Sequence, residues 1–578
     1  MNSIDSLRLP IASYLLWLTC MLPSLAAVEG AAPLARSAAP MPELRSVTGV
    51  RQLYVDGQPF LMLAGELHNS TASSSDYAAP HWDKLRAMHV NTVVSTVSWS
   101  ECEPDEGRFD FASLDAQLVA ARAHGLRLVL VWFGAFKNAS SSYAPTWVRA
   151  DERRFPRATV KGAGKEAFTY PGAMAKPVLS VFSPALLASD RRAFIAMLRH
   201  LSLVDRRHVA ILVQVENETG LLRGSGDHAP LAEAAWNSRV PIELMQYLDQ
   251  HRSALRPELL AAWSQSGYPS EGTWAQVFGD DWRAEEVFMA WHFARYVGSL
   301  AAAGKQVLPL PMYANAWLGP QPGQERAGEY PSGGPVAAML DVWKAGAPQL
   351  DFIAPDVYVR DVKEAMAGYA RSDNPLFNPE AEFRAGSLFW ALGHHRALGF
   401  SVFGVEDGKR DSQLASAYRM IESMLGVVAK AQAEDRIEGV LIEEPDDLAR
   451  LSLGGYAIVA RGARTAMGRM LLDAGIQAPP APEPLPSETD SGHVPGDQRP
   501  FGIVIAESQD TFLVVGQDLL LDFNHGGDRV EVDSIEEGNY VRGVWVRGRI
   551  LNGDERLMPL PPDHIGAVRI RLLRLPAQ

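Results

Sequence analysis

An apolar run that ends abruptly in polar residues is the first stretch of this sequence that could do chemistry. Residues 209–215 are apolar apart from Gln214, and Glu216, Asn217 and Glu218 follow directly. A continuous run rich in Val and Ile predicts a strand that is buried on both faces of a parallel sheet. Carboxylates at the end of such a strand can donate protons or act as nucleophiles. A strand that simply enters a polar loop has the same pattern, so a second carboxylate must come from elsewhere.

The rest of the chain alternates short apolar runs with amphipathic segments. The runs predict eight strands, at residues 60–68, 91–97, 126–133, 209–217, 307–313, 351–358, 375–380 and 400–407. Apolar residues at helical spacing predict helices at 82–89, 111–124, 189–200, 241–263, 282–303 and 413–431. Eight strands that alternate with helices indicate an α/β protein with a (β/α)8 TIM barrel. Prolines in the fifth, sixth and seventh runs are unusual for central strands, because proline has no N–H for the ladder.

Most of these predicted strands end in residues that could bind or cleave a sugar. The carboxyl ends of all eight strands surround one pit in a barrel. Each residue singly has a structural explanation, such as a turn, a loop contact or a core aromatic ring. Together they indicate a carbohydrate site. The residues are Glu66 and His68; Trp99, Glu101 and Glu103; Asn217 and Glu218; Asp356 and Tyr358; Glu380; and Glu406 with Asp407.

Composition limits the classes of protein and partner. The chain has 578 residues, of which 47% are hydrophobic, so it can bury a large core and form more than one domain. Its net charge is −14 and it has no basic run, which argues against a nucleic-acid partner. Cys20 and Cys102 are its two cysteines, too few for a Cys-based metal site. We expect the chemistry to need no metal and no cofactor.

The N-terminus predicts export. Arg8 precedes an apolar stretch at residues 11–25, and small residues follow at Ala26 and Ala27. This pattern is typical of a secretory signal peptide at residues 1–27, and the stretch is short for a membrane anchor. We therefore expect a periplasmic or extracellular protein without a membrane anchor. Residues 28–44 are rich in Ala and Pro and are expected to be disordered.

Composition changes again after the predicted barrel, which spans residues 45–435. Residues 436–578 contain short β-rich runs separated by turns such as His-Gly-Gly at 525–527. This pattern predicts an antiparallel β-sandwich, for which a structural role at the barrel edge is a simpler expectation than polysaccharide binding. Residues 478–500 are rich in Pro and polar residues, so we expect a stiff, exposed linker or long loop there.

Several motifs together resemble those of glycoside hydrolase family 35, the retaining β-galactosidases. Residues 214–218, Gln-Val-Glu-Asn-Glu, resemble the strand-four signature of this family, which belongs to a clan with an Asn-Glu pair there. Residues 99–104 and 107–111 resemble the strand-two pattern of the clan, with its Trp, Glu-Pro and Gly-x-Phe-Asp-Phe. Residues 65–70 and 132–138 resemble a bacterial branch with an extra C-terminal β-domain. The resemblance extends from about residue 50 to the C-terminus.

The sequence departs from the family at two places near the expected site. Thr219 stands where many members have Tyr, and Phe136 and Lys137 stand where strand three of the family carries a Glu. These changes affect the galactose contacts in that half of the pocket. We expect Lys137 and Asn138 to replace some of them.

The resemblance implies roles for several of the strand-end residues. Glu218 corresponds to the proton donor, which burial beside a second acid would keep protonated at the start of the reaction. Asn217 would bind the sugar 2-hydroxyl, Trp99 would present an aromatic platform, and Tyr358 would place a hydroxyl beside the nucleophile. Glu66 and His68 would add further substrate contacts.

Two carboxylates compete for the role of nucleophile. Glu380 and Glu406 both end predicted strands, and either strand could direct a side chain across the barrel toward strand four. The clan resemblance favours strand seven and therefore Glu380. Because Glu406 adjoins Asp407 and two basic residues, we expect it to form an ion pair at the rim.

The resemblance implies an exo-acting, retaining β-galactosidase. Such an enzyme would remove terminal non-reducing β-D-galactose from a galactose-containing oligosaccharide or polysaccharide of the plant cell wall or a similar glycan. Two alternatives stay open: a β-glucosidase or β-mannosidase on the same barrel, and a non-catalytic carbohydrate-binding protein. Loss of one of the two acids would indicate the binding protein, whereas this sequence has both candidates.

Overall fold

The computed structural model describes residues 39–161, 178–477 and 483–576. The signal peptide predicted at residues 1–27 lies outside the described residues. Strand β1 (Glu43–Val47) begins within residues 28–44, the segment expected to be disordered. Residues 43 and 44 of that segment are therefore ordered. No helix in the described ranges is both long and apolar enough to span a bilayer.

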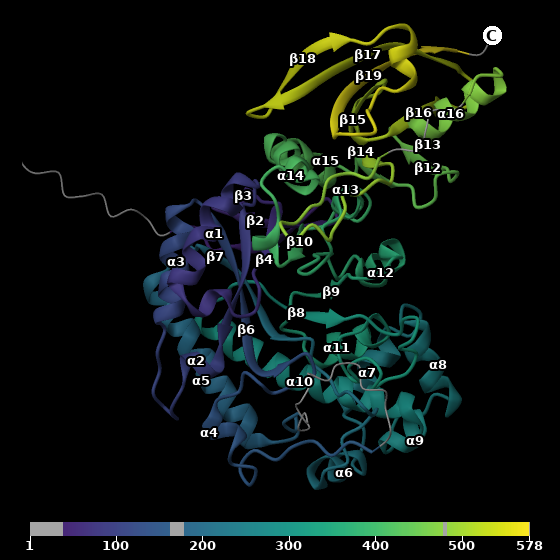
Figure 1. Cartoon of the computed structure of the whole chain (residues 1–578). Coiled ribbons are helices and arrows are strands. Elements are labelled where there is room, and N and C mark those ends of the chain that lie inside the picture. The colour runs from purple at the N-terminus through teal and green to yellow at the C-terminus, as the bar shows by residue number, and fades with distance from the viewer. Residues whose placement is uncertain (1–38, 162–177, 478–482, 577–578) are drawn as a thin grey trace, which may run out of the picture. The chain divides into compact units, whose positions relative to one another are not determined.

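A curled parallel sheet forms the core of the first part of the chain (Figure 1). Its seven strands follow the order β10-β4-β5-β6-β7-β8-β9, and every neighbouring pair is parallel. Each strand overlaps one of the predicted runs, which confirms the α/β barrel. The strands are β4 (Met62–Glu66), β5 (Thr92–Ser98), β6 (Arg127–Lys137), β7 (Ala210–Asn217), β8 (Met312–Trp317), β9 (Phe352–Asp356) and β10 (Gly399–Phe403).

The seventh predicted strand, residues 375–380, is irregular, but it is hydrogen-bonded to β10 on one side and to the end of β9 on the other. The Ser401 N–H of β10 donates to the Asn378 carbonyl at 2.9 Å, and the Val357 N–H donates to the Glu380 carbonyl at 2.8 Å. Pro379 has no N–H, so this segment cannot continue a regular ladder. The segment therefore closes the barrel with single bridges instead of a strand.

Helices follow the strands as predicted, with a larger insertion after β7. The predicted helix at residues 241–263 is two helices, because α8 begins at Pro257, a residue that favours a first turn. The helices around the barrel are α1 (Ser75–Ala87), α3 (Ala112–Ala123), α5 (Pro184–Val204), α10 (Trp282–Val307), α11 (Leu340–Gly346), α12 (Val362–Tyr369), α13 (Ala385–Gly393), α14 (Gln413–Ser423) and α15 (Leu425–Ala433). The insertion holds α6 (Pro230–Trp236), α7 (Ile242–Gln250), α8 (Pro257–Gln265) and α9 (Trp274–Phe278).

A small antiparallel sheet precedes the barrel and packs against its core. It consists of β1, β2 (Val50–Val55) and β3 (Gln58–Pro59). Leu53 of β2 is buried in the same apolar cluster as Met62 of β4, Ile211 of β7 and Phe377. The sheet thus buries apolar side chains that the barrel strands alone would leave exposed.

The C-terminal part consists of two antiparallel sheets that share an apolar core, as predicted. One sheet has the order β11-β14-β15-β19-β17-β18 and the other β12-β13-β16. Helix α16 (Ala463–Asp473) joins them and was not predicted. The strands are β11 (Ile437–Leu441), β12 (Ala449–Leu453), β13 (Tyr456–Gly462), β14 (Phe501–Ser508), β15 (Thr511–Gln517), β16 (Leu519–Asn524), β17 (Arg529–Val541), β18 (Val544–Ile550) and β19 (Gly566–Leu575).

Residues 483–500 contain no helix or strand and many of them are exposed, but some of their side chains are buried against the barrel helices. The Glu488 carboxylate accepts hydrogen bonds from the backbone N–H groups of Gln413 and Leu414 at the start of α14. Asp497 is fully buried and accepts a hydrogen bond from the Gly386 N–H in α13 at 3.0 Å. Proline-rich composition predicts a stiff chain but not its exposure, and here buried carboxylates attach that chain to helix N-termini.

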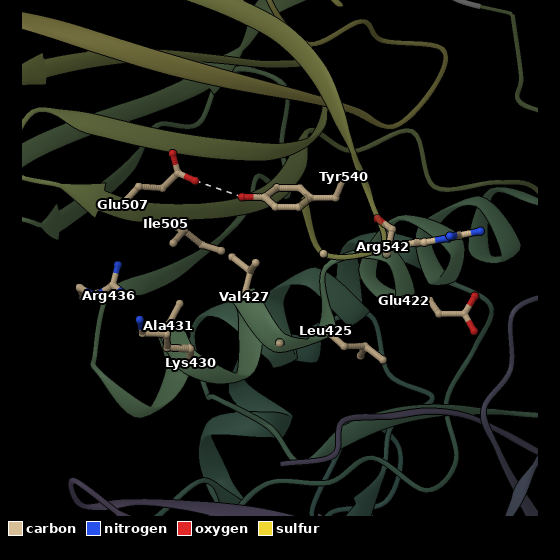
Figure 2. Close-up of a pocket in the computed structure, with 13 residues that line it drawn as sticks. Glu422, Leu425, Val427, Lys430, Ala431, Arg436, Ile505, Glu507, Tyr540 and Arg542 are labelled. Atoms are coloured by element: carbon tan, nitrogen blue, oxygen red, sulfur yellow. Dashed lines mark hydrogen bonds between the residues drawn. The ribbon is translucent and has the colours of Figure 1, made fainter. Parts of the chain in front are cut away.

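A cavity of about 540 Å³ lies between α14–α15 and the larger C-terminal sheet. Figure 2 shows the Tyr540 ring over Val427 and Ile505, with the Tyr540 hydroxyl donating to Glu507 at 3.1 Å. The residues that line this cavity lie between positions 422 and 543, and they include none of the polar residues that end the barrel strands.

Replacing Asp497 by Ala is expected to lower the free energy of unfolding by about 3 kcal/mol, because Arg499 and the Gly386 N–H would lose a buried ionised partner. Asp490→Ala is the matched control in the same segment. Asp490 is exposed and pairs only with Lys84, so its loss should cost less than about 1 kcal/mol. Urea unfolding measures both variants, and equal effects would contradict the buried position of this segment.

Candidate active site

The structure brings Glu218 and Glu380 together at the carboxyl end of the barrel. Glu218 directly follows β7, and Glu380 lies in the segment that closes the barrel. Asn217 Nδ2 donates to Glu380 Oε1 at 3.3 Å, and the Tyr358 hydroxyl donates to Glu380 Oε2 at 2.8 Å. Both acids are nearly buried, with 6% of each residue exposed. A donor therefore faces each oxygen of Glu380, an arrangement that suits a carboxylate.

Glu218 has a pKa suited to proton transfer near neutrality. Burial, and then the negative charge of Glu380, raise the pKa of Glu218 to about 7. Lys137 opposes this rise by its charge, and Asn138 by its hydrogen bond, in which Nδ2 donates to Glu218 Oε2 at 2.6 Å. The Glu218 N–H donates to Asn315 Oδ1 at 3.0 Å. Below about pH 7 this carboxyl group is thus protonated and can act as an acid.

Lys137 fixes the orientation of the amide between the two acids. Its Nζ donates to Asn217 Oδ1 at 2.9 Å, so the Asn217 amide nitrogen faces Glu380. Lys137 is buried, with its ammonium 4.9 Å from the centre of the Phe133 ring. Lys137 and Asn138, which were expected to supply contacts in this half of the pocket, therefore contact Asn217 and Glu218 directly.

Glu66 lies in the same cluster as an inner acid. It is fully buried, and no hydrogen-bond donor in the described part of the chain reaches either of its oxygens. Burial, followed by the charge of Glu380, raises the pKa of Glu66 well above the ordinary value. None of the surface of Glu66 is exposed, and its predicted substrate contact stays a prediction. The raised pKa places a neutral acid beside the pair.

Asp356 and Asn315 belong to the site; Asp356 was noted from the sequence as a strand-end residue without a specific role, and Asn315 was missed. Asn315 Nδ2 donates to Asp356 Oδ2 at 2.7 Å, while its Oδ1 accepts the Glu218 N–H. Asp356 is hydrogen-bonded to Glu218, and burial together with the charges of Glu380 and Glu218 raises its pKa well above the ordinary value. The available signal was a polar residue in the apolar run of β8. We call Glu66, Glu218, Asp356 and Glu380 the carboxyl cluster.

Trp99 does not reach the carboxyl cluster. It is fully buried, and its Nε1 donates to Glu103 Oε2 at 2.8 Å. Glu103 also accepts a hydrogen bond from Arg192 at 2.6 Å. The Trp99 ring is therefore not exposed to the site, because Trp99 and Glu103 satisfy each other beneath the surface, and its role as an aromatic platform stays a prediction.

Glu406 and His68 stabilise the rim of the barrel. The buried Glu406 carboxylate accepts hydrogen bonds from the His68 N–H at 2.9 Å and the Thr71 hydroxyl at 2.7 Å. Lys84 donates to the Glu406 backbone carbonyl and not to its carboxylate, and no salt bridge of Glu406 is found among the described residues, so the predicted ion pair is not seen there. Asp407 pairs with the half-exposed His68 ring instead, at 2.9 Å. Both groups hold the loop that follows β4, and neither is bonded to Glu218 or Glu380.

The arrangement is that of a barrel with two facing acids, and sequence comparisons associate it with glycoside hydrolases. Residues 72–253 match a family model described as β-galactosidase, Glyco_hydro_42. Residues 414–558 match a domain of unknown function, DUF5597. The first match includes Lys137, Asn217 and Glu218. It does not confirm the predicted family number, 35, and the property that the two families share is the description β-galactosidase.

Individual relatives carry the same description. A β-galactosidase of Xanthomonas manihotis is 32% identical over 19% of this chain and 19% of its own length. A human β-galactosidase-1-like protein 3 is 24% identical over 35% of this chain and 28% of its own length. This chain thus matches less than a third of either curated relative. A catalytic mutant of a GH42 β-galactosidase from G. stearothermophilus is 11% identical with a TM-score of 0.45, over 88% of this chain and 98% of that chain.

Replacing Glu380 by Gln is expected to lower the pKa of Glu218 from about 7 toward its ordinary value, because the charge of Glu380 adds to burial in raising it. Asn138→Ala should raise this pKa, since the Asn138 amide donates to the ionised form. Isotope-edited infrared titration can follow the carboxyl stretch, with Glu218→Gln as the blank. An unchanged pKa in Glu380→Gln would show that the two acids do not interact.

Proposed function

We propose that this protein is a retaining, exo-acting β-galactosidase that removes terminal non-reducing β-D-galactose from plant cell-wall oligosaccharides or similar glycans. One observation carries the proposal: a carboxyl group with a pKa of about 7 faces a second carboxyl group that two donors hold at the carboxyl end of a barrel. The β-galactosidase match of residues 72–253 supports the choice of sugar.

The proposed first step breaks the glycosidic bond. A Glu380 oxygen attacks the anomeric carbon while Glu218 transfers its proton to the leaving glycosidic oxygen. The bond from the anomeric carbon to Glu380 forms as the bond to the leaving oxygen breaks. The products are a free hydroxyl on the released portion and a covalent galactosyl-enzyme.

The proposed second step regenerates the enzyme. Glu218, now ionised, takes a proton from water, and the water oxygen attacks the anomeric carbon. The bond to Glu380 breaks, and its electrons return to the carboxylate. Two inversions at one carbon give net retention of the β-configuration.

The surrounding residues have specific tasks in this mechanism. Asn217 is proposed to bind the sugar 2-hydroxyl, because its amide already lies beside the nucleophile in an orientation fixed by Lys137. The half-exposed Tyr358 keeps the Glu380 carboxylate in place through its hydroxyl. Asn138 holds the Glu218 carboxyl group, and it favours the ionised form needed in the second step.

The first test is a panel of nitrophenyl glycosides. The β-galactoside should be hydrolysed faster than the β-glucoside and the β-mannoside, and β-galactose should be the first sugar product by NMR. Faster turnover of the β-glucoside would replace the proposed substrate with a glucoside. Turnover of none of the three would favour a carbohydrate-binding protein.

The second test identifies the nucleophile. Glu380→Ala should be nearly inactive, and azide should restore turnover and give the α-azide, because azide attacks from the side that the carboxylate vacated. Glu218→Ala should keep activity on substrates with good leaving groups, and azide should then give the β-azide. Glu406→Ala is the control for a buried acid of the rim. Rescue to the α-azide in Glu406→Ala, with Glu380→Ala still active, would overturn the assignment.

The third test measures the spacing of the pair. A retaining mechanism requires the two carboxyl groups to be roughly 5–5.5 Å apart, whereas an inverting one needs about 6.5–9.5 Å for a water molecule. A crystal structure with bound galactose measures this distance. The larger separation, together with α-galactose as first product, would contradict retention.

A further inference from the structure

A second pair of buried acids lies behind the active site and has no part in the mechanism above. Asp190 of α5 and Glu216 of β7 are both fully buried, and their carboxyl groups are hydrogen-bonded to each other. Glu216 belongs to the same stretch as Glu218, but it points to the other side of the strand. It is one of few non-glycine residues with positive φ, at 62°. Such backbone strain persists where surrounding contacts hold it.

The pair receives the N–H groups of an irregular part of β6. In the pairing of β6 with β7, Trp132 lies opposite Val215, and the next paired residues are Lys137 and Asn217. Strand β6 therefore has extra residues between these two pairs and forms a bulge there. Within this bulge the Phe136 N–H donates to Glu216 Oε2 at 2.8 Å. The Ala135 N–H donates to Glu216 Oε1 at 3.1 Å and lies 3.3 Å from Asp190 Oδ2. The carboxyl groups thus replace the backbone acceptors that the bulge removes.

The charges around the pair require a shared proton. Asp190 also accepts hydrogen bonds from Trp132 Nε1 at 2.9 Å and from the Tyr296 hydroxyl of α10 at 2.8 Å. Among the described residues, no Lys, Arg or His forms a salt bridge with either acid. Two adjacent buried carboxylates without a cation cannot both be ionised, so one proton stays between them. Burial, and then Asp190, raise the pKa of Glu216 well above the ordinary value, which places this proton on Glu216.

The residue inside the bulge leaves room for both acids. A Cβ on Gly134 would lie 2.5 Å from Glu216 Oε1 and 2.8 Å from Asp190 Oδ1. Any larger residue would therefore separate the acids from the bulge. The glycine at position 134, the bulge in β6 and the two buried acids therefore fit one another.

The end of the bulge leads directly into the active site. Lys137 and Asn138 follow it, and they bind Asn217 and Glu218 through their side chains. The Asn138 N–H also donates to the Asn217 carbonyl at 3.2 Å. A shift of the bulge would therefore move both contacts together.

We propose that Asp190 and Glu216 are positioning residues: by sharing one proton they hold the β6 bulge, and the bulge places Lys137 and Asn138 against Asn217 and Glu218. Only the kinetic test of this inference rests on the proposed function, because it needs turnover of a β-galactoside. The pair touches no substrate and takes no part in bond making. Its effect reaches the reaction through the protonation and orientation of Glu218.

The numbers of hydrogen-bond donors and acceptors around the pair predict opposite effects of two isosteric changes: one keeps the hydrogen bonds of the pair and the other disrupts them. In Glu216→Gln, the new amide can donate to Asp190 in place of the O–H, and its oxygen still accepts the Phe136 N–H. The Ala135 N–H keeps Asp190 Oδ2 as an acceptor. In Asp190→Asn, one acceptor oxygen must serve Trp132, Tyr296 and Ala135, so a new N–H faces another donor. Each change removes one carboxyl group of similar size, so the pair of variants is matched.

Kinetics of both variants test the proposal. Glu216→Gln should keep kcat on the β-galactoside within about threefold, whereas Asp190→Asn should lower it about 100-fold, the cost of a misplacement of about 1 Å. The alkaline limit of activity should move to higher pH in Asp190→Asn, because Glu218 loses the Asn138 bond that lowers its pKa. Glu380, Asp356 and Glu66 face Glu218 in both variants and act on its pKa equally. Equal loss in the two variants, or an unshifted alkaline limit, would overturn the proposal.

Two further measurements distinguish the positioning role from a simple folding defect of Asp190→Asn. Adding Tyr296→Phe to Asp190→Asn removes one of the competing donors and should restore part of the lost kcat, whereas Tyr296→Phe alone should change little. Hydrogen exchange of a peptide covering residues 130–140 should be faster in Asp190→Asn than in wild type and unchanged in Glu216→Gln. If wild type hydrolyses no glycoside, the proposed function fails, but this exchange experiment still decides the role of the pair.

Discussion

Burial of many carboxyl groups in one small volume is the constraint on which this structure depends. The carboxyl cluster gathers four acids around Lys137, and a further pair, Asp190 and Glu216, lies behind it. Burial penalises every charge, and each ionised acid penalises the next. Protons are therefore retained where donors are few, as at Glu66, and a carboxylate is best accommodated where donors are available, as at Glu380. This distribution distinguishes the acid that lacks donors from the one that has two.

The barrel provides the geometry, but its irregular parts position the chemistry. Glu380 comes from a proline-containing segment that closes the barrel through isolated bridges. Lys137 and Asn138 follow a bulge in β6, and Glu218 has a positive φ of 42°. Regular strands alternate their side chains between two faces, so they could not direct successive residues toward one point. Each irregularity is held by buried polar contacts, such as those of Asn315 and Glu216.

The C-terminal sheets are attached to the barrel by buried polar groups as well as by apolar packing. Asp497 and Glu488 bind the backbone of α13 and α14, and β11 and β14 pack against α13. These contacts lie away from the carboxyl cluster. They favour the structural role that composition suggested for this part of the chain.

The sequence by itself determined the strands, their order and the residues at their ends, because a buried parallel strand must be apolar and its end is where polar residues begin. It therefore placed Glu218, Asn217, Tyr358 and both Glu380 and Glu406 at one face of the barrel, and the choice of Glu380 over Glu406 came from the family resemblance. The tertiary structure decided which way each side chain points. Trp99 turns inward to Glu103, Glu406 supports a loop, and Asn315 joins the site beside Asp356. The direction of a side chain depends on the register of its strand and on bulges. A shift of the register by one residue moves a side chain to the opposite face of the sheet, and no local sequence pattern records such a shift.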